Sequence, residues 1–297
     1  MGWDAPNSGS RAGWWIALST FVAALVAVAA LWAGGAAAID DAGGSAPAPS
    51  PAARPNRLEP LSIAPGHIRP RVVLYGDSLA WESRQSFAFT LAAAGADVQA
   101  RTWGGTAICD FFHTMRKDAA EMHPDAVVVE FIGNAFSQCM RSRAPMTGDE
   151  PVDAYRSDAQ EVLRIFPKAR VYFVGAPVGA PGKPGEFHPG SLNSMYRNQA
   201  VRHPSARYVD AGAAVLDHGR WTKTLPCLPH EPCTGGRDSH GRRVNVVRAP
   251  DGTHFCPNAA AAEFGVTQAC AVWSSGAFRF GTAMSKAVAA DFPRSGR

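Results

Sequence analysis

The sequence "VVLYGDSLAWES" (Val72–Ser83) joins an apolar run to a helical pattern through Gly76, Asp77 and Ser78. An apolar run rich in valine is typical of a strand buried within a parallel sheet. Glycine permits the sharp turn that must follow such a strand, and aspartate and serine are common at the start of a helix. The stretch therefore predicts a strand that delivers Ser78 to its carboxyl end, directly before a helix.

The same alternation of strand and helix continues along the chain. Apolar runs bounded by turn residues predict strands, and apolar residues spaced three and four apart predict helices. Strands that alternate with helices favour a parallel sheet covered by helices on both faces. The sequence therefore predicts a three-layer α/β/α fold with a central parallel sheet of about five strands. The expected strands are 71–76, 97–103, 125–133, 169–177 and 206–215, and the expected helices are 79–96, 111–122, 152–166 and 194–203.

Hydrogen-bond donors follow three of the predicted strands. Ser78 follows the first, Gly104 and Gly105 follow the second, and Gly133 and Asn134 follow the third. Each of them has an ordinary structural explanation, as a helix cap or as part of a tight turn. Ligands bind at the carboxyl ends of the strands in such sheets, so these donors are also expected to converge on one crevice, where they could stabilise an anion.

A candidate base and its partner come late in the chain, in "APDGTHFCP". Asp251 and His254 are three residues apart, so the carboxylate can accept a hydrogen bond from one ring nitrogen while the other ring nitrogen faces a serine. A serine hydroxyl needs such a base because it is barely nucleophilic at its own pKa. Asp110 and His113 share this spacing, but they begin a predicted helix, where an aspartate cap and a packed histidine are expected.

Four short motifs resemble, in their order, the blocks of the SGNH (GDSL) hydrolase superfamily. They are "GDSL" at 76–79, the glycine pair at 104–105, "GN" at 133–134 and "DGTH" at 251–254, and the resemblance covers roughly residues 70–292. The combination is specific, whereas any one motif alone would be weak. The resemblance implies a flavodoxin-like arrangement of the α/β/α layers and a serine esterase mechanism that uses no metal and no organic cofactor.

The resemblance also implies roles for individual residues. Ser78 would be the nucleophile, His254 the general base and Asp251 the carboxylate that orients the base. The oxyanion hole would consist of the backbone N–H of Ser78, the N–H of Gly105 and the side-chain amide of Asn134. These groups would together perform acyl transfer through an acyl-serine.

Two positions bear on how closely the chain follows the superfamily. Gly104 is the alternative to Gly105 as oxyanion donor, and Gly105 is preferred because the small residue Thr106 follows it. The superfamily commonly has an aspartate after the asparagine of the third block, and this chain has Ala135 there. The change bears on substrate positioning more than on the chemistry.

The N-terminal part of the chain has a different composition. Residues 14–32 ("WWIALSTFVAALVAVAALW") carry no charge and are long enough to cross a bilayer. Arg11 precedes them and Asp40 and Asp41 follow, so the rest of the chain is expected outside the cytoplasm. The segment is either an uncleaved anchor or a signal peptide cleaved after Ala38. We expect a signal or anchor segment at 1–39, an Ala/Pro/Gly-rich linker at 40–69 and a hydrolase domain at 70–297.

The six cysteines suit an exported chain, because disulfides persist outside the cytoplasm. Two of them share one proline-rich loop, two others flank a helix-like segment, and these pairings leave a third pair. Buried free thiols are the alternative. No C-x-x-C pair is present, so a zinc cluster is not expected. The expected disulfides are Cys109–Cys139, Cys227–Cys233 and Cys256–Cys270.

The composition narrows the range of partners. With 46% hydrophobic and 18% charged residues the chain can bury a large core, and a net charge of +4 is too weak and scattered to favour nucleic acid. Arg237, Arg242, Arg243 and Arg248 cluster in sequence, and we expect them on a solvated loop. We expect a monomer that contacts the membrane only if its N-terminal segment stays uncleaved.

The expected function is hydrolysis of an acyl or acetyl ester of a small lipid or an envelope glycan. Two alternatives remain open: an O-acyltransferase that passes the same acyl group to a sugar or lipid alcohol, and a catalytically silent envelope-binding module. Because His254 must be neutral to accept a proton, activity is expected to fall below about pH 6–7. The export segment, linker and cysteines resemble secreted actinobacterial members of the superfamily.

Overall fold

The computed structural model describes residues 61–143, 149–180, 189–256, 270 and 272–292. The chain divides after Pro55, and all of these residues belong to the unit Asn56–Arg297. The predicted signal or anchor segment (1–39) and most of the predicted linker (40–69) lie outside the described residues. Among the helices in the described ranges, none is both long and apolar enough to cross a membrane.

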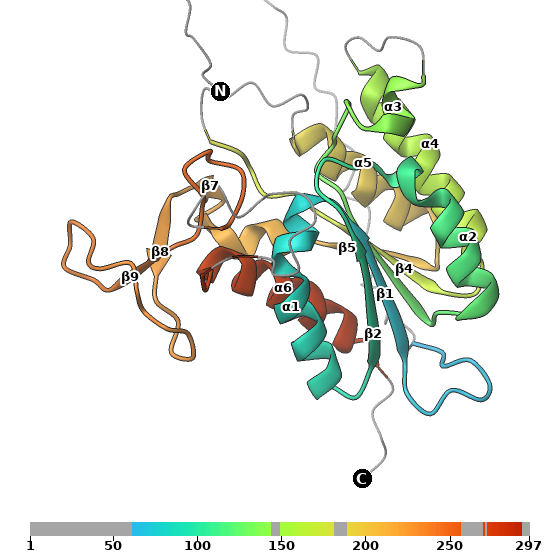
Figure 1. Ribbon diagram of the computed structural model, residues 1–297, viewed down its shortest axis with the longest axis horizontal. Coiled ribbons are helices and arrows are strands. Elements are labelled where there is room, and N and C mark those ends of the chain that lie inside the picture. Colours follow the sequence, from blue (N-terminus) through green and yellow to red (C-terminus); the bar gives the residue numbers. More distant parts are fainter. Residues whose placement is uncertain (1–60, 144–148, 181–188, 257–269, 271, 293–297) are drawn as a thin grey trace, which may run out of the picture. The chain divides into compact units, whose positions relative to one another are not determined.

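Five parallel strands form the central sheet, as the alternation of strands and helices predicts (Figure 1). They are β1 (Arg71–Gly76), β2 (Asp97–Thr102), β3 (Ala126–Glu130), β4 (Arg170–Val174) and β5 (Ala206–Val209). Their order across the sheet is β2-β1-β3-β4-β5, which is the flavodoxin-like order. The order reverses at β1 and β3, and ligands bind beyond the carboxyl ends of the strands at such a point.

Helices cover both faces of this sheet and bury two apolar clusters (Figure 1). Helices α1 (Ser78–Ala93) and α6 (Ser275–Ala289) pack on the face that carries Leu74 and Val128. Helices α2 (Phe112–Glu121), α4 (Glu150–Ile165) and α5 (Pro189–Arg202) cover the face that carries Val73 and Val127. Because neighbouring strand residues point to opposite faces, strands buried on both sides need continuous apolar runs. Two short helices, η1 (Ile108–Phe111) and α3 (Gln138–Arg141), follow β2 and β3.

Helix α4 shows how the sequence pattern becomes structure. Its buried residues Val152, Tyr155, Ala159 and Val162 recur at intervals of three or four and therefore lie on one side of the helix. Pro151 stands in the first turn, where its missing N–H costs no helical hydrogen bond. The predicted helix 152–166 therefore matches the observed one closely.

The last three strands end earlier than the apolar runs suggest. The prediction of one strand over 206–215 is wrong beyond Val209, because a 3-10 helix, η2 (Ala211–Val215), follows. Alanine and glycine have a low preference for strands, and the backbone at Gly212 packs so closely that a Cβ there would lie 2.8 Å from Pro177. The earlier ends of β3 and β4 leave Asn134 and Pro177 in the loops beyond the sheet.

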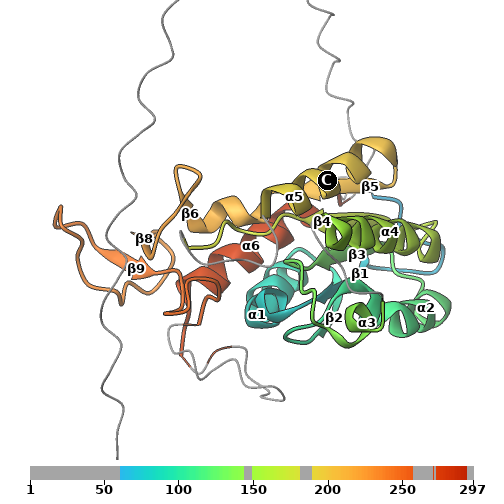
Figure 2. The same cartoon turned by 90° about the horizontal axis from the view of Figure 1, so that it is seen from above.

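Two antiparallel strand pairs follow the sheet in sequence, and the sequence pattern does not predict them. They are β6 (Leu216–Asp217) with β7 (Arg220–Trp221), and β8 (Thr224–Pro226) with β9 (Val244–Val246). Strands of two or three residues are too short for a detectable alternation of apolar and polar residues. Figures 1 and 2 both show β8 and β9 set apart from the central sheet.

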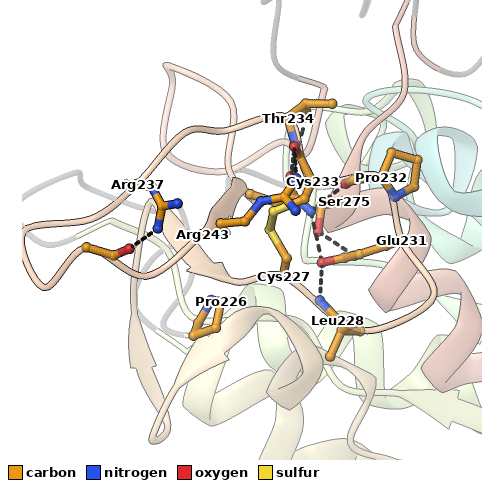
Figure 3. The surroundings of a disulfide bond; sticks show 12 residues. Pro226, Cys227, Leu228, Glu231, Pro232, Cys233, Thr234, Arg237, Arg243 and Ser275 are labelled. Atoms are coloured by element: carbon orange, nitrogen blue, oxygen red, sulfur yellow. Dashed lines mark hydrogen bonds between the residues drawn. A yellow bond between two sulfur atoms is a disulfide. The ribbon is translucent and has the colours of Figure 1, made fainter.

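A buried carboxylate, Glu231, ties this strand pair to α6 (Figure 3). Four groups donate hydrogen bonds to it, and one of them is a charged guanidinium, so burial of the carboxylate is compensated. These donors are the N–H of Leu228 (2.9 Å), Asn245 Nδ2 (2.9 Å), Ser275 Oγ (2.9 Å) and Arg279. The tie joins the loop before β9 to a helix of the main fold.

The six cysteines form the three disulfides suggested by the sequence. Cys227–Cys233 closes the loop that carries Glu231 (Figure 3). The other two are Cys109–Cys139 and Cys256–Cys270. The helix-like segment expected between the last two cysteines lies outside the described residues.

Candidate active site

Gly76 ends β1 at a point where a larger residue does not fit. A Cβ there would lie 2.3 Å from Ala80 Cβ and 2.6 Å from the carbonyl oxygen of Glu130. Asp77 then caps α1, because its Oδ1 accepts the N–H of Leu79 at 3.1 Å. Ser78 is therefore the first residue of the helix, at the carboxyl end of β1.

Ser78, His254 and Asp251 lie in one hydrogen-bonded chain. His254 Nε2 is 2.9 Å from Ser78 Oγ, and His254 Nδ1 is 2.5 Å from Asp251 Oδ2. Asp251 also shapes the turn, because its Oδ1 accepts the N–H groups of Thr253 (2.8 Å) and His254 (3.0 Å). The structure therefore brings together the serine, histidine and aspartate that the motifs single out.

The turn that carries His254 depends on a close approach at Gly252. Gly252 has φ +80°, and a Cβ there would lie 2.6 Å from Ala180 Cβ. Trp221 Nε1 donates to the carbonyl oxygen of Gly252 at 2.9 Å. The N–H of Ala249 donates to the carbonyl oxygen of His254 at 2.7 Å and closes the turn. Glycine is required at such a positive φ, which explains the second letter of "DGTH".

The histidine and aspartate stabilise each other's charge. Burial raises the pKa of Asp251, but hydrogen bonds from His254 and from the N–H of Thr253 outweigh burial and hold this pKa well below its usual range. Burial lowers the pKa of His254, but the hydrogen bond to Asp251 and the negative charges of Glu82, Asp251 and Asp77 raise it above its ordinary value. His254 is consequently a stronger base than a free imidazole.

Asn134 joins three strand ends through one amide. Its Nδ2 donates to Asp77 Oδ2 at 2.9 Å and to the carbonyl oxygen of Thr106 at 2.9 Å. Tyr155 Oη donates to the carbonyl oxygen of Asn134 at 3.3 Å. Asn134 thus lies against the residues that follow β1 and β2, but both of its amide hydrogens already have acceptors. An oxyanion would have to share or replace one of them.

The turn after β2 carries the candidate glycine donor. Gly105 has φ +74°, a conformation that favours glycine, and Thr106 Oγ1 donates to the carbonyl oxygen of Trp103 at 2.6 Å. Gly133 has φ +102° and allows the chain to turn directly before Asn134. The turns after β2 and β3 therefore favour glycine because of their backbone conformation.

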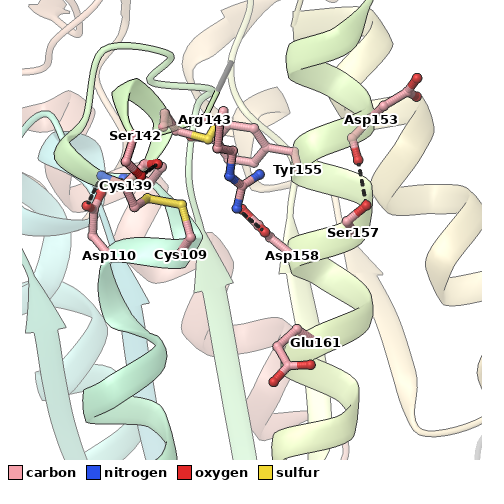
Figure 4. Close-up of polar contacts among 12 residues, drawn as sticks. Cys109, Asp110, Cys139, Ser142, Arg143, Asp153, Tyr155, Ser157, Asp158 and Glu161 are labelled. Atoms are coloured by element: carbon pink, nitrogen blue, oxygen red, sulfur yellow. Dashed lines mark hydrogen bonds and ion pairs between the residues drawn. A yellow bond between two sulfur atoms is a disulfide. The ribbon is translucent and has the colours of Figure 1, made fainter. Parts of the chain in front are cut away.

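The second Asp–His pair of the sequence is not a base with its carboxylate. Asp110 Oδ2 accepts the N–H of Ala107 at 2.8 Å and Oδ1 accepts the N–H of Cys139 at 2.9 Å (Figure 4). Asp110 does not cap α2 as expected: it lies inside η1 and accepts the N–H of the residue before that short helix. The expectation of a packed His113 is wrong, because this side chain is exposed in the second position of α2.

Two buried carboxyl groups lie near Ser78, and the sequence motifs include neither of them. Glu130 is fully buried and Glu82 is 3% exposed. Glu130 Oε2 accepts the N–H of Ala80 at 3.0 Å, and Glu82 Oε2 accepts the N–H of Phe255 at 2.6 Å. Glu130 ends an apolar strand, and Glu82 stands four residues after Ser78, which places it on the same side of α1. Those placements are the signals that could have identified them.

Burial dominates the titration of the carboxyls near Ser78. It raises the pKa of Asp77 to about 6, against the hydrogen bonds from the N–H groups of Ile132 and Leu79. It raises the pKa of Glu82 to about 7, against the charge of His254. Burial and the charge of Asp77 together raise the pKa of Glu130 well above its usual range.

The expectation that Arg248 lies on a solvated loop is wrong. This side chain is 1% exposed, whereas Arg237, Arg242 and Arg243 are exposed as expected. The guanidinium of Arg248 donates to the carbonyl oxygens of Thr253 (3.2 Å) and Val178 (3.3 Å). Burial lowers its pKa to about 10, opposed by the charges of Glu82 and Asp251. The compensating carboxylates explain why the cation lies inside.

Glu82, Cys256 and Cys270 are close enough in the described part of the chain to suggest a metal site, since their ligand atoms lie within 4.8 Å of one another. The two sulfurs are bonded to each other. Cysteine binds metal as a thiolate, so this cluster does not fit a metal ion.

Comparisons with known proteins place the chain in a family. No curated protein matches it significantly. The C-terminal catalytic domain of peptidoglycan O-acetyltransferase A from Streptococcus pneumoniae is 16% identical, with a TM-score of 0.47 over 76% of this chain and 98% of that one. A lipase/acylhydrolase from Enterococcus faecalis is 15% identical, with a TM-score of 0.48 over 77% of this chain and all of that one (100%). A family model described as "Protein of unknown function (DUF459)" matches residues 71–262, well over half of the chain. The chain therefore belongs to the DUF459 family.

Proposed function

We propose that the protein is an exported serine esterase of the SGNH type, which hydrolyses carboxylic esters through an acyl-serine intermediate. One observation carries the proposal: the hydrogen-bonded chain from Asp251 through His254 to Ser78 at the carboxyl end of β1. A base within hydrogen-bond reach of a hydroxyl, and oriented by a carboxylate, is the arrangement that activates serine.

In the first half of the reaction, Ser78 Oγ attacks the ester carbonyl carbon and His254 Nε2 takes the hydroxyl proton. The carbonyl π electrons move to oxygen, and a tetrahedral oxyanion forms. Asp251 stabilises the imidazolium that results. The oxyanion collapses, the bond to the alcohol oxygen breaks, and His254 returns the proton to the departing alcohol. Water repeats the sequence on the acyl-serine and releases the acid.

The oxyanion is stabilised, in this proposal, by the N–H groups of Ser78 and Gly105 and by Asn134 Nδ2. Asn134 already donates to Asp77 and Thr106, so one amide hydrogen must be shared between its present acceptor and the oxyanion.

Two features support the assignment to the outside of the cytoplasm. The structure contains three disulfides, and such bonds are typical of oxidising compartments. Residues 14–32 form an uncharged segment of bilayer-spanning length, as an anchor or a signal peptide would require. The substrates proposed are therefore acyl or acetyl esters of envelope lipids or glycans.

Hydrolysis of p-nitrophenyl esters from acetate to palmitate tests the proposal. We expect Ser78→Ala to lower kcat by at least about 10³-fold, because residual catalysis would come only from the remaining groups. Ser157→Ala, which removes an exposed hydroxyl on α4, is the matched control and should retain full activity. Equal rates for the two variants would contradict the proposal, and acyl transfer to an added alcohol in preference to water would reassign the enzyme as an acyltransferase.

A further inference from the structure

We propose that Glu82 is a positioning residue, whose buried carboxylate fastens the histidine loop to the nucleophile's helix and favours the positively charged form of His254. The inference rests on the proposed esterase function and deepens it. No step of the mechanism above uses Glu82, and none of the sequence motifs includes it.

The geometry ties the two halves of the site together twice. Ser78 and Glu82 stand one turn apart on α1, and His254 and Phe255 are neighbours on the loop. His254 Nε2 is 2.9 Å from Ser78 Oγ, and the N–H of Phe255 donates to Glu82 Oε2 at 2.6 Å. The two contacts join segments 176 and 173 residues apart in sequence. The hydrogen bond from Phe255 to Glu82 therefore helps to hold His254 within hydrogen-bond distance of Ser78.

Burial of a carboxylate to make this hydrogen bond is unfavourable in free energy. Glu82 is 3% exposed and its Oε1 has no hydrogen-bond partner, although the backbone N–H of Cys256, like that of Phe255, favours the charged form of the carboxylate. A buried carboxylate with a bare oxygen costs more than a neutral amide that offers the same acceptor to Phe255. A tie alone does not need the charge, so the charge itself is the informative feature.

The charged groups around Glu82 come from three directions. The histidine loop contributes His254 and Asp251, the segment before it contributes Arg248, and β3 contributes Glu130. Arg248 lies over the Phe255 ring, with the guanidinium carbon 5.3 Å from the ring centroid. Arg248 favours the ionised form of Glu82, whereas Glu130 and Asp251 oppose it.

The negative charges around His254 favour its positively charged form. Asp251 bonds to its Nδ1, and the charges of Glu82 and Asp77 act on the ring without a hydrogen bond to it. Arg248 contributes a positive charge to this group of residues, where Glu82 and Asp251 stabilise it. When Ser78 transfers its proton to His254, the new positive charge forms near Glu82 in a partly buried site, where such interactions are stronger than in water. Glu82 itself neither gains nor loses a proton in this step.

The substitution Glu82→Gln tests the charge, because the amide keeps an acceptor for Phe255. We expect the NMR titration midpoint of the His254 imidazole in the full-length protein to fall by up to about one pH unit, because Glu82, whose pKa burial raises to about 7, is partly ionised where the imidazole titrates. The acid limb of kcat/KM for p-nitrophenyl acetate should move to lower pH by the same amount. Glu121→Gln makes the same chemical change at an exposed position at the end of α2, and both of its curves should coincide with those of the wild type.

A second substitution, Glu82→Asp, tests the reach. It keeps the charge but shortens the side chain, so the tie to Phe255 lengthens while the acid limb stays near that of the wild type. We expect kcat to fall about 10-fold to 100-fold with little change in KM. Circular dichroism checks that each variant is folded, and Glu82→Asp decides the question if Glu82→Gln does not fold.

The outcomes separate this inference from the proposed function. A His254 midpoint in Glu82→Gln equal to that of the wild type overturns the inference, even if the protein is an active esterase. Wild-type kcat in Glu82→Asp overturns it as well. A shifted midpoint in a protein that hydrolyses no ester supports the influence of Glu82 on His254 and rejects the esterase.

Discussion

Asn134 is the residue on which three strand ends depend. Its side-chain amide donates to Asp77 after β1 and to the carbonyl oxygen of Thr106 after β2. Tyr155 from α4 donates to its backbone carbonyl oxygen. Truncation to alanine removes the proposed oxyanion donor and leaves the buried Asp77 with one donor fewer. The side chain therefore links catalysis with the packing of the turn beneath it.

We expect Asn134→Ala to lower kcat by about 10²–10³-fold with a much smaller change in KM, because the donor acts on charge that develops in the transition state. Steady-state kinetics on the best p-nitrophenyl ester measure both constants. Asn198→Ala, at an exposed position of α5, is the control and should match the wild type. A rise in KM with unchanged kcat would place Asn134 in ground-state binding instead.

The raised pKa of His254 predicts the pH dependence of activity. Because the reaction begins with neutral imidazole, kcat/KM is lost as the pH falls through the pKa of His254 in the free enzyme. Burial alone lowers that pKa, but Asp251 and the nearby carboxylates raise it above the ordinary imidazole value. The acid limb should therefore have its midpoint above about pH 6.5. A pH–rate profile measures it, and an optimum near about pH 4 would contradict a histidine base.

At the scale of elements, the disulfide Cys109–Cys139 ties the turn after β2 to the turn after β3 (Figure 4). It joins η1 to α3, and Asp110 reinforces the link by accepting the N–H of Cys139 at 2.9 Å. The same two turns carry Gly105 and Asn134. The bond should therefore stabilise both the fold and the relative position of the two donors.

We expect the double variant Cys109→Ser/Cys139→Ser to lose about 3–4 kcal/mol of unfolding free energy, the value for a closed loop of about 30 residues. Thermal unfolding should show a fall in Tm of about 10 °C. Below the new Tm, kcat should fall more than KM rises, because the turns that carry the donors are less fixed. The pair Cys227→Ser/Cys233→Ser, which opens a much shorter loop, should cost less, and a larger loss there would contradict the chain-entropy argument.

At the scale of the whole molecule, buried acids make stability depend on pH in the opposite sense to surface ion pairs. The folded pKa of Glu82 is about 7, and burial raises it from an ordinary value of 4.5. The contribution of protonated Glu82 to the free energy of unfolding is fully present below its ordinary pKa and is lost as the pH rises through about 7. Asp77, raised to about 6, acts with the same sign. The site therefore costs the fold most at the pH where its base is active.

Because ionised Glu82 destabilises the fold, we expect Glu82→Gln to be more stable relative to the wild type at alkaline pH than at acid pH, although the substitution impairs the site. The Tm of the variant relative to the wild type should rise by about 5 °C between pH 5 and pH 8, on the order of 2 kcal/mol. Calorimetry at the two pH values measures the change. Glu121→Gln should show no such pH-dependent difference, and a constant offset for Glu82→Gln would show that Glu82 does not ionise in the folded protein.

The layers of the fold and the three residues of the Ser78–His254–Asp251 chain could be predicted before the structure was known. Apolar runs and helical spacing are local patterns, so the starts of the five strands and the bounds of α1, α2 and α4 could be placed within a few residues, whereas α6 (Ser275–Ala289) was not predicted. Ser78 could be found because it follows an apolar strand at the start of a helical pattern, and Asp251 and His254 could be found because they stand three residues apart in a motif late in the chain.

The polar groups that surround those residues could not be predicted, because they come from distant parts of the chain. Glu82 meets the N–H of Phe255 from 173 residues away, and no local pattern records such a pair. The sequence predicts a surface position for Arg248, but in the structure two carbonyl oxygens accept its hydrogen bonds, and the charges of Glu82 and Asp251 stabilise it. The amide of Asn134 looks available until Asp77 and Thr106 accept both of its hydrogens. Periodicity reports which side of an element is buried, whereas the charge state and hydrogen bonding of a buried group depend on neighbours that only the folded chain supplies.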